Sequence, residues 1–151
     1  MIDGVKTKVL RVIPDERGRL MEILRADDDL FERFGQVYIT TAYPGVVKAW
    51  HCHTKQVDHF TVVSGMVKMV LADLREDSPT KGEAQEFFIG RDNPLLVKIP
   101  PGVYHGLKCI GVTEAIALNV PTEMYDYNEP DEIRLPWNSP KIDYSWDIDL
   151  K

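Results

Sequence analysis

Residues 45–65 read GVVKAWHCHTKQVDHFTVVSG, a stretch of the form G-x5-H-x-H-x4-D-x6-G. It is apolar and rich in β-branched residues, which favours strands. Side chains alternate across a strand, so His51 and His53 are expected on one face, with Cβ atoms roughly 7 Å apart. Two imidazoles that point the same way suit proton transfer near neutral pH, and they also suit a metal ion.

A third imidazole, His105, comes from the segment PPGVYHG, so three of the four histidines lie in segments that could converge on one pocket. Together with Asp58 they form a three-nitrogen, one-carboxylate set suited to Fe, Mn, Ni or Zn. The alternative is that Asp58 only orients an imidazole. His59 is interpreted as structural or exposed.

Length and charge limit the class of protein. The 151 residues predict a single domain, residues 1–151, that buries roughly 70% of its unfolded surface. A net charge of −6 argues against general nucleic-acid binding. No apolar run is long enough to span a membrane, and the charged N-terminal segment does not resemble a signal peptide. Two cysteines are too few for a disulfide framework, which favours a cytoplasmic location.

The chain reads as mostly β, because short segments rich in β-branched and aromatic residues alternate with turn clusters. This pattern predicts a sandwich or a small barrel. Residues 27–35 (DDDLFERFG) are expected to form a helix, because acidic residues stand at the start and Gly35 follows the end. From about residue 121 the chain becomes acidic, aromatic and proline-rich. Its aromatic residues predict packing on the domain or on a partner subunit.

The stretch 45–65 resembles the first cupin motif, with Asp58 at the usual glutamate, and residues 100–105 resemble the core of the second. Over nearly its whole length the sequence also resembles the dTDP-4-dehydrorhamnose 3,5-epimerase family. This resemblance implies a cupin-type jelly roll, a double-stranded β-helix barrel. The motifs that carry it are D-x-R-G-x-L-x-E (15–22), Q-x-Y-x-T (36–40, where the family has Q-x-N-x-S), K-A-W-H (48–51), D-L-R-x2-S-P-T-x-G (73–82), P-G-V-Y-H-G (101–106) and W-N-S-P (137–140).

The resemblance also implies roles. His51 stands at the family's catalytic base, and a metal-free site without other cofactors is implied. A nucleotide-diphosphate sugar is the implied substrate, and we expect a homodimer. Arg17 could pair with the diphosphate, since guanidinium binds phosphate in a forked geometry. The expected substrate-binding residues are Arg17, Glu22, Gln36, Lys48, His105 and Asn119.

Two departures from the family matter for function. Asn119 stands where the family has the tyrosine of Y-x-C-T that acts as general acid, and asparagine cannot donate a proton in that role. Conversely, His51-x-His53 resembles the H-A-H-K of sugar 3,4-ketoisomerases, which use both histidines. The chain therefore resembles both groups.

The chemistry can be argued from the substrate. A 4-keto sugar has acidic hydrogens at C3 and C5, because loss of either gives an enolate delocalised onto O4. His51 supplies the base. Lys48 would face away from His51 in a regular strand, unless a bulge re-aims it; otherwise His105 must hold the enolate oxygen. Inversion needs a proton on the opposite face, whereas transfer from C3 to C4 on one face needs only His51 and His53.

We therefore expect an epimerase that acts on a nucleotide-diphosphate 4-keto-6-deoxy sugar in surface polysaccharide biosynthesis. Three alternatives stay open. The first is a 3,4-ketoisomerase that uses His51 and His53. The second is a metal-dependent cupin with ligands His51, His53, Asp58 and His105. The third is a non-catalytic sugar-binding cupin.

Overall fold

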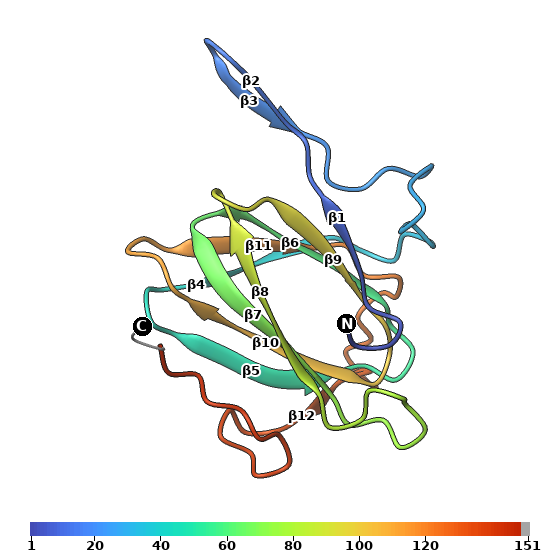
Figure 1. Ribbon diagram of the computed structural model, residues 1–151. Coiled ribbons are helices and arrows are strands. Elements are labelled where there is room, and N and C mark those ends of the chain that lie inside the picture. The colour runs from blue at the N-terminus through green and yellow to red at the C-terminus, as the bar shows by residue number, and fades with distance from the viewer. Residues whose placement is uncertain (149–151) are drawn as a thin grey trace.

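The computed structural model describes residues 1–148, which form two five-stranded antiparallel sheets packed face to face and a separate hairpin (Figure 1). The first sheet has the order β1-β9-β6-β11-β4 and the second β12-β5-β10-β7-β8. The strands of the first sheet are β1 (Lys6–Val9), β4 (Tyr38–Ala42), β6 (Asp58–Ser64), β9 (Leu95–Ile99) and β11 (Ala115–Asn119). Those of the second are β5 (Val47–Cys52), β7 (Met66–Asp73), β8 (Ala84–Gly90), β10 (Val103–Cys109) and β12 (Ile133–Arg134).

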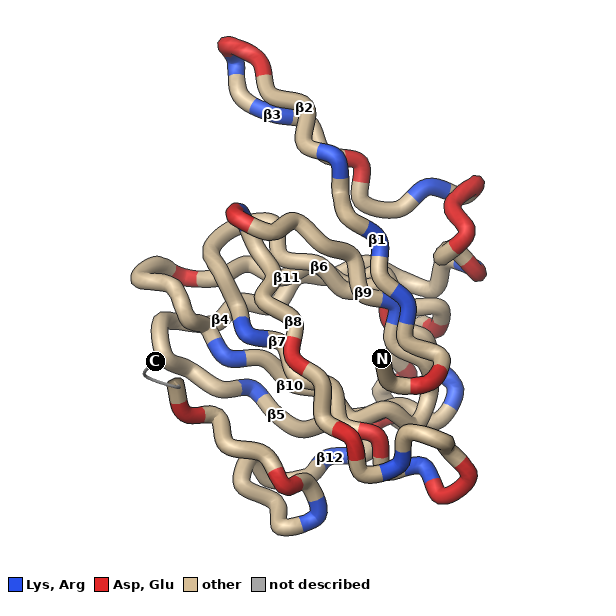
Figure 2. Tube along the Cα trace, viewed as in Figure 1, with Lys and Arg blue, Asp and Glu red and all other residues tan. Residues whose placement is uncertain are grey.

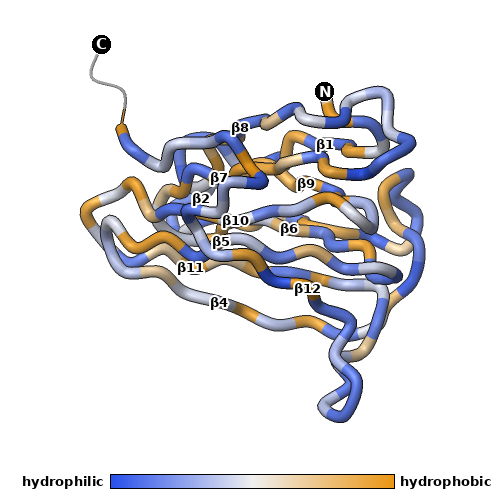
Figure 3. Tube along the Cα trace, turned by 90° about the horizontal axis from the view of Figure 1, so that it is seen from below, coloured by the Kyte–Doolittle hydropathy of each residue, from blue (hydrophilic) through white to orange (hydrophobic). Residues whose placement is uncertain are grey.

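The apolar core lies between the two sheets. Along β10, Val103, Leu107 and Cys109 are buried in this core, and His105 shares their parity. Hydrophobic positions recur along the strands of both sheets (Figure 3), and β7 is buried along nearly its whole length. Strand alternation therefore places His105 among inward-facing residues. The predicted all-β, cupin-type jelly roll is confirmed.

The predicted helix at residues 27–35 is wrong, because the segment forms turns and extended chain. Its polar groups are held by other parts of the molecule. The Leu30 carbonyl accepts a hydrogen bond from His59 Nε2 at 2.7 Å, and Gly35 N donates to Pro121 O at 3.0 Å. A Cβ on Gly35 would lie 2.4 Å from the Glu123 backbone, so glycine permits this close approach. Nine residues are too few for a helix to resist such tertiary contacts.

The C-terminal segment packs on the outer face of the second sheet, which confirms the prediction for part of it. Trp146 lies 4.9 Å from Trp50 and Tyr144 lies 5.9 Å from it, both measured between ring centroids. Lys68 and Lys108 donate from the sheet to the Asp147 and Trp146 carbonyls. The segment therefore covers the outside of β5, β7 and β10.

The hairpin of β2 (Val12–Asp15) and β3 (Gly18–Met21) projects from the sandwich, with acidic and basic residues at its tip (Figures 1 and 2).

The D-L-R-x2-S-P-T motif has a structural role. Asp73 is buried and accepts hydrogen bonds from Arg75, Ser78 and Thr80, which closes the loop between β7 and β8. The described residues include no helix that could cross a membrane.

Candidate active site

Polar side chains replace the apolar core at one end of the sandwich. At this end β5 and β11 finish, while β4, β6 and β10 begin. His51 and His105 are direct cross-strand partners on β5 and β10, which belong to the second sheet. Tyr38 and Asn119 are cross-strand partners on β4 and β11, which belong to the first. The site is therefore built from both sheets.

The three predicted imidazoles meet here. The ring centroids of His51 and His105 are 4.1 Å apart, those of His51 and His53 5.7 Å, and those of His53 and His105 5.9 Å. The convergence expected from the sequence is thus observed. His59 lies outside the cluster, fully buried and hydrogen-bonded to the Val120 and Leu30 carbonyls, so it is structural.

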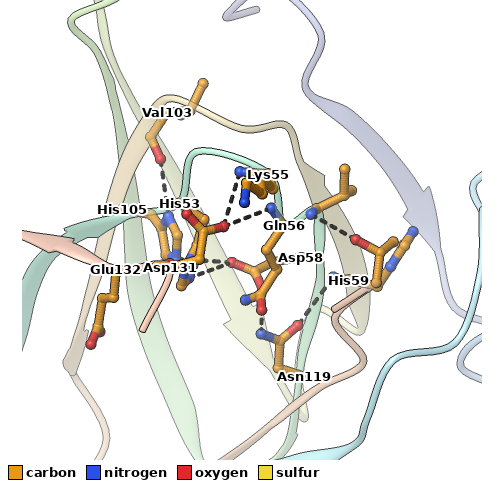
Figure 4. Close-up of polar contacts among 12 residues, drawn as sticks. His53, Lys55, Gln56, Asp58, His59, Val103, His105, Asn119, Asp131 and Glu132 are labelled. Atoms are coloured by element: carbon orange, nitrogen blue, oxygen red, sulfur yellow. Dashed lines mark hydrogen bonds and ion pairs between the residues drawn. The ribbon is translucent and has the colours of Figure 1, made fainter. Parts of the chain in front are cut away.

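Asp58 is the centre of the polar network (Figure 4). Its Oδ2 lies 3.2 Å from His105 Nε2 and 3.5 Å from His53 Nε2. Its Oδ1 accepts hydrogen bonds from Gln56 Nε2 at 2.8 Å and Asn119 Nδ2 at 2.7 Å. Burial alone would raise the pKa of Asp58, but the contacts with His105, His53 and Asn119 outweigh burial and hold this pKa below its usual range. Asp58 is therefore a carboxylate that orients imidazoles.

Backbone carbonyls fix the tautomers of two histidines. Nδ1 of His105 contacts Val103 O at 3.1 Å, and Nδ1 of His53 contacts Asp131 O. A carbonyl can only accept, so each Nδ1 carries a hydrogen. Nε2 of His105 then faces Asp58, whereas Nε2 of His53 is buried and makes no hydrogen bond within the described part of the chain.

Asp131 is a structural residue that sequence reasoning missed. Its carboxylate accepts hydrogen bonds from the backbone N–H groups of Thr54, Lys55 and Gln56 and from the Thr54 hydroxyl. Burial acts against these bonds, yet they lower the pKa of Asp131 to about 2. The residue clamps the loop after β5 and, through its carbonyl, orients His53. No sequence motif marks it.

His51 has the environment of a neutral base. Burial, and then the positive charge that His105 can carry, lower the pKa of His51 well below 6.5, although Asp58 acts in the opposite direction. The imidazole is therefore neutral at pH 7 and able to accept a proton.

Lys48 faces the same interior as His51 because β5 contains an irregularity. His51 pairs with His105 and Lys48 with Leu107, so three residues of β5 span two of β10. Gly106 allows this close approach, since a Cβ there would lie 2.4 Å from Ala49 Cβ. Lys48 Nζ donates to Thr40 Oγ1 at 3.2 Å, which bridges the two sheets. A bulge that re-aims Lys48, one of the two alternatives that the sequence left open, is therefore present.

A pocket of about 360 Å³ opens beside the histidines. His51 and His53 line it from the second sheet, while Gln36 and Tyr38 line it from β4 and the segment before that strand. Sequence reasoning assigned Tyr38 no role in the site, because its motif, Q-x-Y-x-T, served only as evidence of family resemblance. The remaining lining residues are Gln56, Met124, Tyr125, Tyr127, Asp131, Glu132 and Arg134.

Of the predicted binding residues, Gln36 lines this pocket, and Arg17 and Glu22 lie away from the site. Arg17 lies at the tip of the projecting hairpin, paired with Asp15 and with 84% of its side chain exposed. Glu22 follows β3 and pairs with Arg25. Asn119 is buried behind the pocket, where it contacts Asp58 and Tyr38. Of the six predicted binding residues, the structure therefore brings Gln36, Lys48, His105 and Asn119 to the site.

The histidine cluster could hold a metal ion, because one nitrogen from each of His51, His53 and His105 lies within 4.8 Å of the others. Asp58 could become a fourth ligand only if its contact with His105 were broken and replaced by a bond to the metal. His53 Nε2 is the nitrogen that is already free of a hydrogen-bond partner among residues 1–148.

Comparisons with known proteins agree on one family. The family described as "Polysaccharide biosynthesis C-terminal domain" matches residues 13–133. The spore coat polysaccharide biosynthesis protein SpsL of Bacillus subtilis is 44% identical over 151 residues, which cover all of both chains. The probable low-salt glycan biosynthesis epimerase Agl13 of Haloferax volcanii is 41% identical over 99% of this chain and 97% of its own. The crystal structure of a dTDP sugar isomerase from Desulfovibrio desulfuricans G20 superposes with a TM-score of 0.91 at 36% identity, covering 96% of this chain and 92% of the other.

Proposed function

Because the chain belongs to the polysaccharide-biosynthesis family of sugar epimerases and isomerases, we propose that it epimerises a nucleotide-diphosphate 4-keto-6-deoxy sugar by removing a proton next to the ketone. The observation that carries this proposal is the position of His51. Its imidazole lines the pocket, and burial favours the neutral form that can act as a base.

Proton removal leaves negative charge on the ketone oxygen. A hydrogen next to C4 is acidic because the resulting carbanion delocalises onto O4. Lys48 faces the interior three positions before His51 and carries a positive charge that can stabilise O4. His105 lies beside His51, and its two ring nitrogens contact Asp58 and the Val103 carbonyl, which leaves Lys48 as the donor to O4. The base and the oxyanion donor thus both come from β5.

A 3,4-ketoisomerase is the second candidate function. The observation that favours it is the pairing of His51 with His53 on one wall of the pocket, with ring centroids 5.7 Å apart. Nε2 of His53 has no hydrogen-bond partner in the described part of the chain, but it is buried 3.5 Å from Asp58 Oδ2, so proton transfer from C3 to C4 requires the ring to turn toward the pocket. The product distinguishes this reaction from epimerisation.

The proposed working form is a homodimer in the cytoplasm. The hairpin of β2 and β3 projects from the sandwich and exposes Ile13 and Leu20, which supports coverage by a second copy. In such a dimer Arg17 can act at a substrate diphosphate only from the partner subunit. Light scattering, which measures the mass in solution, tests the homodimer when the unmodified protein is compared with Leu20→Glu. The unmodified protein should be a dimer and the variant a monomer, and a monomeric unmodified protein contradicts the proposal.

Product analysis tests the activity. Purified protein is incubated with dTDP-4-keto-6-deoxyglucose, and the sugar is followed by proton NMR. Inversion at C3, at C5 or at both supports the epimerase, and a ketone moved from C4 to C3 supports the ketoisomerase. An unchanged sugar, with the UDP analogue also unchanged, contradicts both proposals and favours a binding protein.

A further inference from the structure

Tyr38 and Asn119 occupy neighbouring positions in the first sheet. They are direct cross-strand partners on β4 and β11, so both side chains point to the same side of the sheet. The resembled family has asparagine in the motif that contains position 38 and tyrosine in the motif that contains position 119. In this chain the two residue types are exchanged between paired strands, which keeps a phenol at the same wall of the site.

The hydrogen bonds of Asn119 determine which way the Tyr38 hydroxyl can act. His59 N donates to Asn119 Oδ1 at 3.1 Å, which fixes the orientation of the amide. Asn119 Nδ2 then donates to Asp58 Oδ1 at 2.7 Å and to Tyr38 Oη at 2.9 Å. Tyr38 is therefore an acceptor in this bond, and its own O–H hydrogen remains available. Among residues 1–148, no hydrogen-bond acceptor for this hydrogen is found.

Tyr38 also lies on the correct side of the pocket for inversion. It lines the pocket from the first sheet, whereas His51 lines it from the second. A sugar between the two walls has one face toward the imidazole and the other toward the phenol. Removing a proton on one face and returning one on the other is what inverts a carbon.

We propose that Tyr38 is the general acid of the reaction and delivers a proton to the enolate carbon on the face opposite His51. This inference rests on the proposed epimerase function. Burial, and then the negative charge of Asp58, raise the pKa of Tyr38, so the phenol is protonated at neutral pH. The hydrogen bond from Asn119 acts in the opposite direction and stabilises the phenolate that forms.

The proton balance of the step is complete. The C–H bond breaks, its proton binds a ring nitrogen of His51, and the electron pair forms the enolate. The Tyr38 O–H bond then breaks as a new C–H bond forms on the opposite face, which restores the ketone and leaves a phenolate. The phenolate gains a proton from water and the imidazolium loses one to water, which resets both groups.

The test is Tyr38→Phe with dTDP-4-keto-6-deoxyglucose in deuterium oxide, because this variant removes only the hydroxyl. We expect inversion to fall on the order of 10²–10⁴-fold, the usual size of a general-acid contribution. Deuterium should still enter at the same carbon with retention, because His51 can return a solvent-derived deuteron to the face it took the proton from. Tyr43→Phe is the control, since Tyr43 is exposed and does not line the pocket.

The outcomes separate this inference from the proposed function. If Tyr38→Phe inverts the sugar at the rate of the unmodified protein, the role of Tyr38 is overturned. The role is also overturned if the variant loses both deuterium exchange and inversion. Either result leaves the epimerase proposal intact if the unmodified protein inverts the sugar. A lack of both exchange and inversion in the unmodified protein, with the dTDP sugar and its UDP analogue, overturns the epimerase proposal and this inference with it.

Discussion

Oδ2 of Asp58 lies 3.2 Å from Nε2 of His105, and both side chains are buried inside the sandwich. His105 meets an acceptor at each ring nitrogen, Asp58 on one side and the Val103 carbonyl on the other. This pattern is the one that an imidazolium satisfies. The pair holds the His105 ring next to His51 in a fixed orientation.

Asp58→Asn should destabilise the fold by about 3–5 kcal/mol, because it leaves the other member of a buried ion pair unpaired. Chemical denaturation measures this change. The matched control is Asp92→Asn, which alters an exposed pair with Arg91 and should change stability by less than about 0.5 kcal/mol. Equal stabilities of the two variants contradict the structural role of Asp58.

The same carboxylate predicts a pH dependence of stability. The pKa of Asp58 is depressed in the folded state, so its contribution is present above the unfolded value of about 4 and is lost as pH falls through the folded pKa. Stability of the unmodified protein should therefore decline below about pH 4, and more steeply than that of Asp58→Asn. Parallel curves for the two proteins would show that this carboxylate is not the cause.

Activity should have its acid limb below pH 6.5, because His51 must be neutral to act as the base and its pKa is lowered. The charged or titratable groups that act on it are His105, Asp58, His53 and Arg134. The basic limb should lie above pH 10, because the pKa of Tyr38 is raised. The measurement is kcat/KM against pH, and an acid midpoint at or above 6.5 contradicts the assignment of His51.

Lys48→Met should lower kcat on the order of 10²–10³-fold, the usual cost of removing one oxyanion donor. Lys48 is exposed and its ammonium donates a hydrogen bond to the Thr40 hydroxyl, so the fold should tolerate the change. Lys55→Met is the control, because this exposed lysine does not line the pocket. An effect on KM alone would assign Lys48 to binding instead of enolate stabilisation.

Protein purified without chelator should contain no stoichiometric transition metal. Asp58 and His105 already satisfy each other, so two members of the four-residue ligand set are engaged. Elemental analysis and an assay after dialysis against chelator check this prediction. About one Fe, Mn, Ni or Zn per chain, lost together with activity, would establish the metal-dependent alternative.

The sequence predicted much of the histidine site. Strand alternation is local, so the shared face of His51 and His53 followed from their spacing, and the turn before His105 indicated a second strand end. The position of Lys48 depended on a bulge opposite Gly106, which arises where two strands approach closely. Such an approach is a property of the pair of strands, and the sequence of β5 alone does not specify it.

Other features depended on contacts that sequence spacing does not encode. Residues 27–35 have helical propensity, but the contact of the Leu30 carbonyl with His59 and the close approach of Gly35 to residues 121–123 hold them in another conformation. Tyr38 becomes a candidate acid only when its pairing with Asn119 is known. Arg17 was assigned by family resemblance, and its distance from the pocket follows from the direction of a hairpin.

The most direct test of His51 as the proton-abstracting base is the rate at which deuterium enters dTDP-4-keto-6-deoxyglucose in deuterium oxide. The comparison is between the unmodified protein and His51→Asn, with equal thermal unfolding confirming that the variant is folded. The predicted result is deuterium at C3 or C5 with the unmodified protein and a loss on the order of 10²–10⁴-fold in the variant. Exchange by His51→Asn at the rate of the unmodified protein would contradict the role of His51.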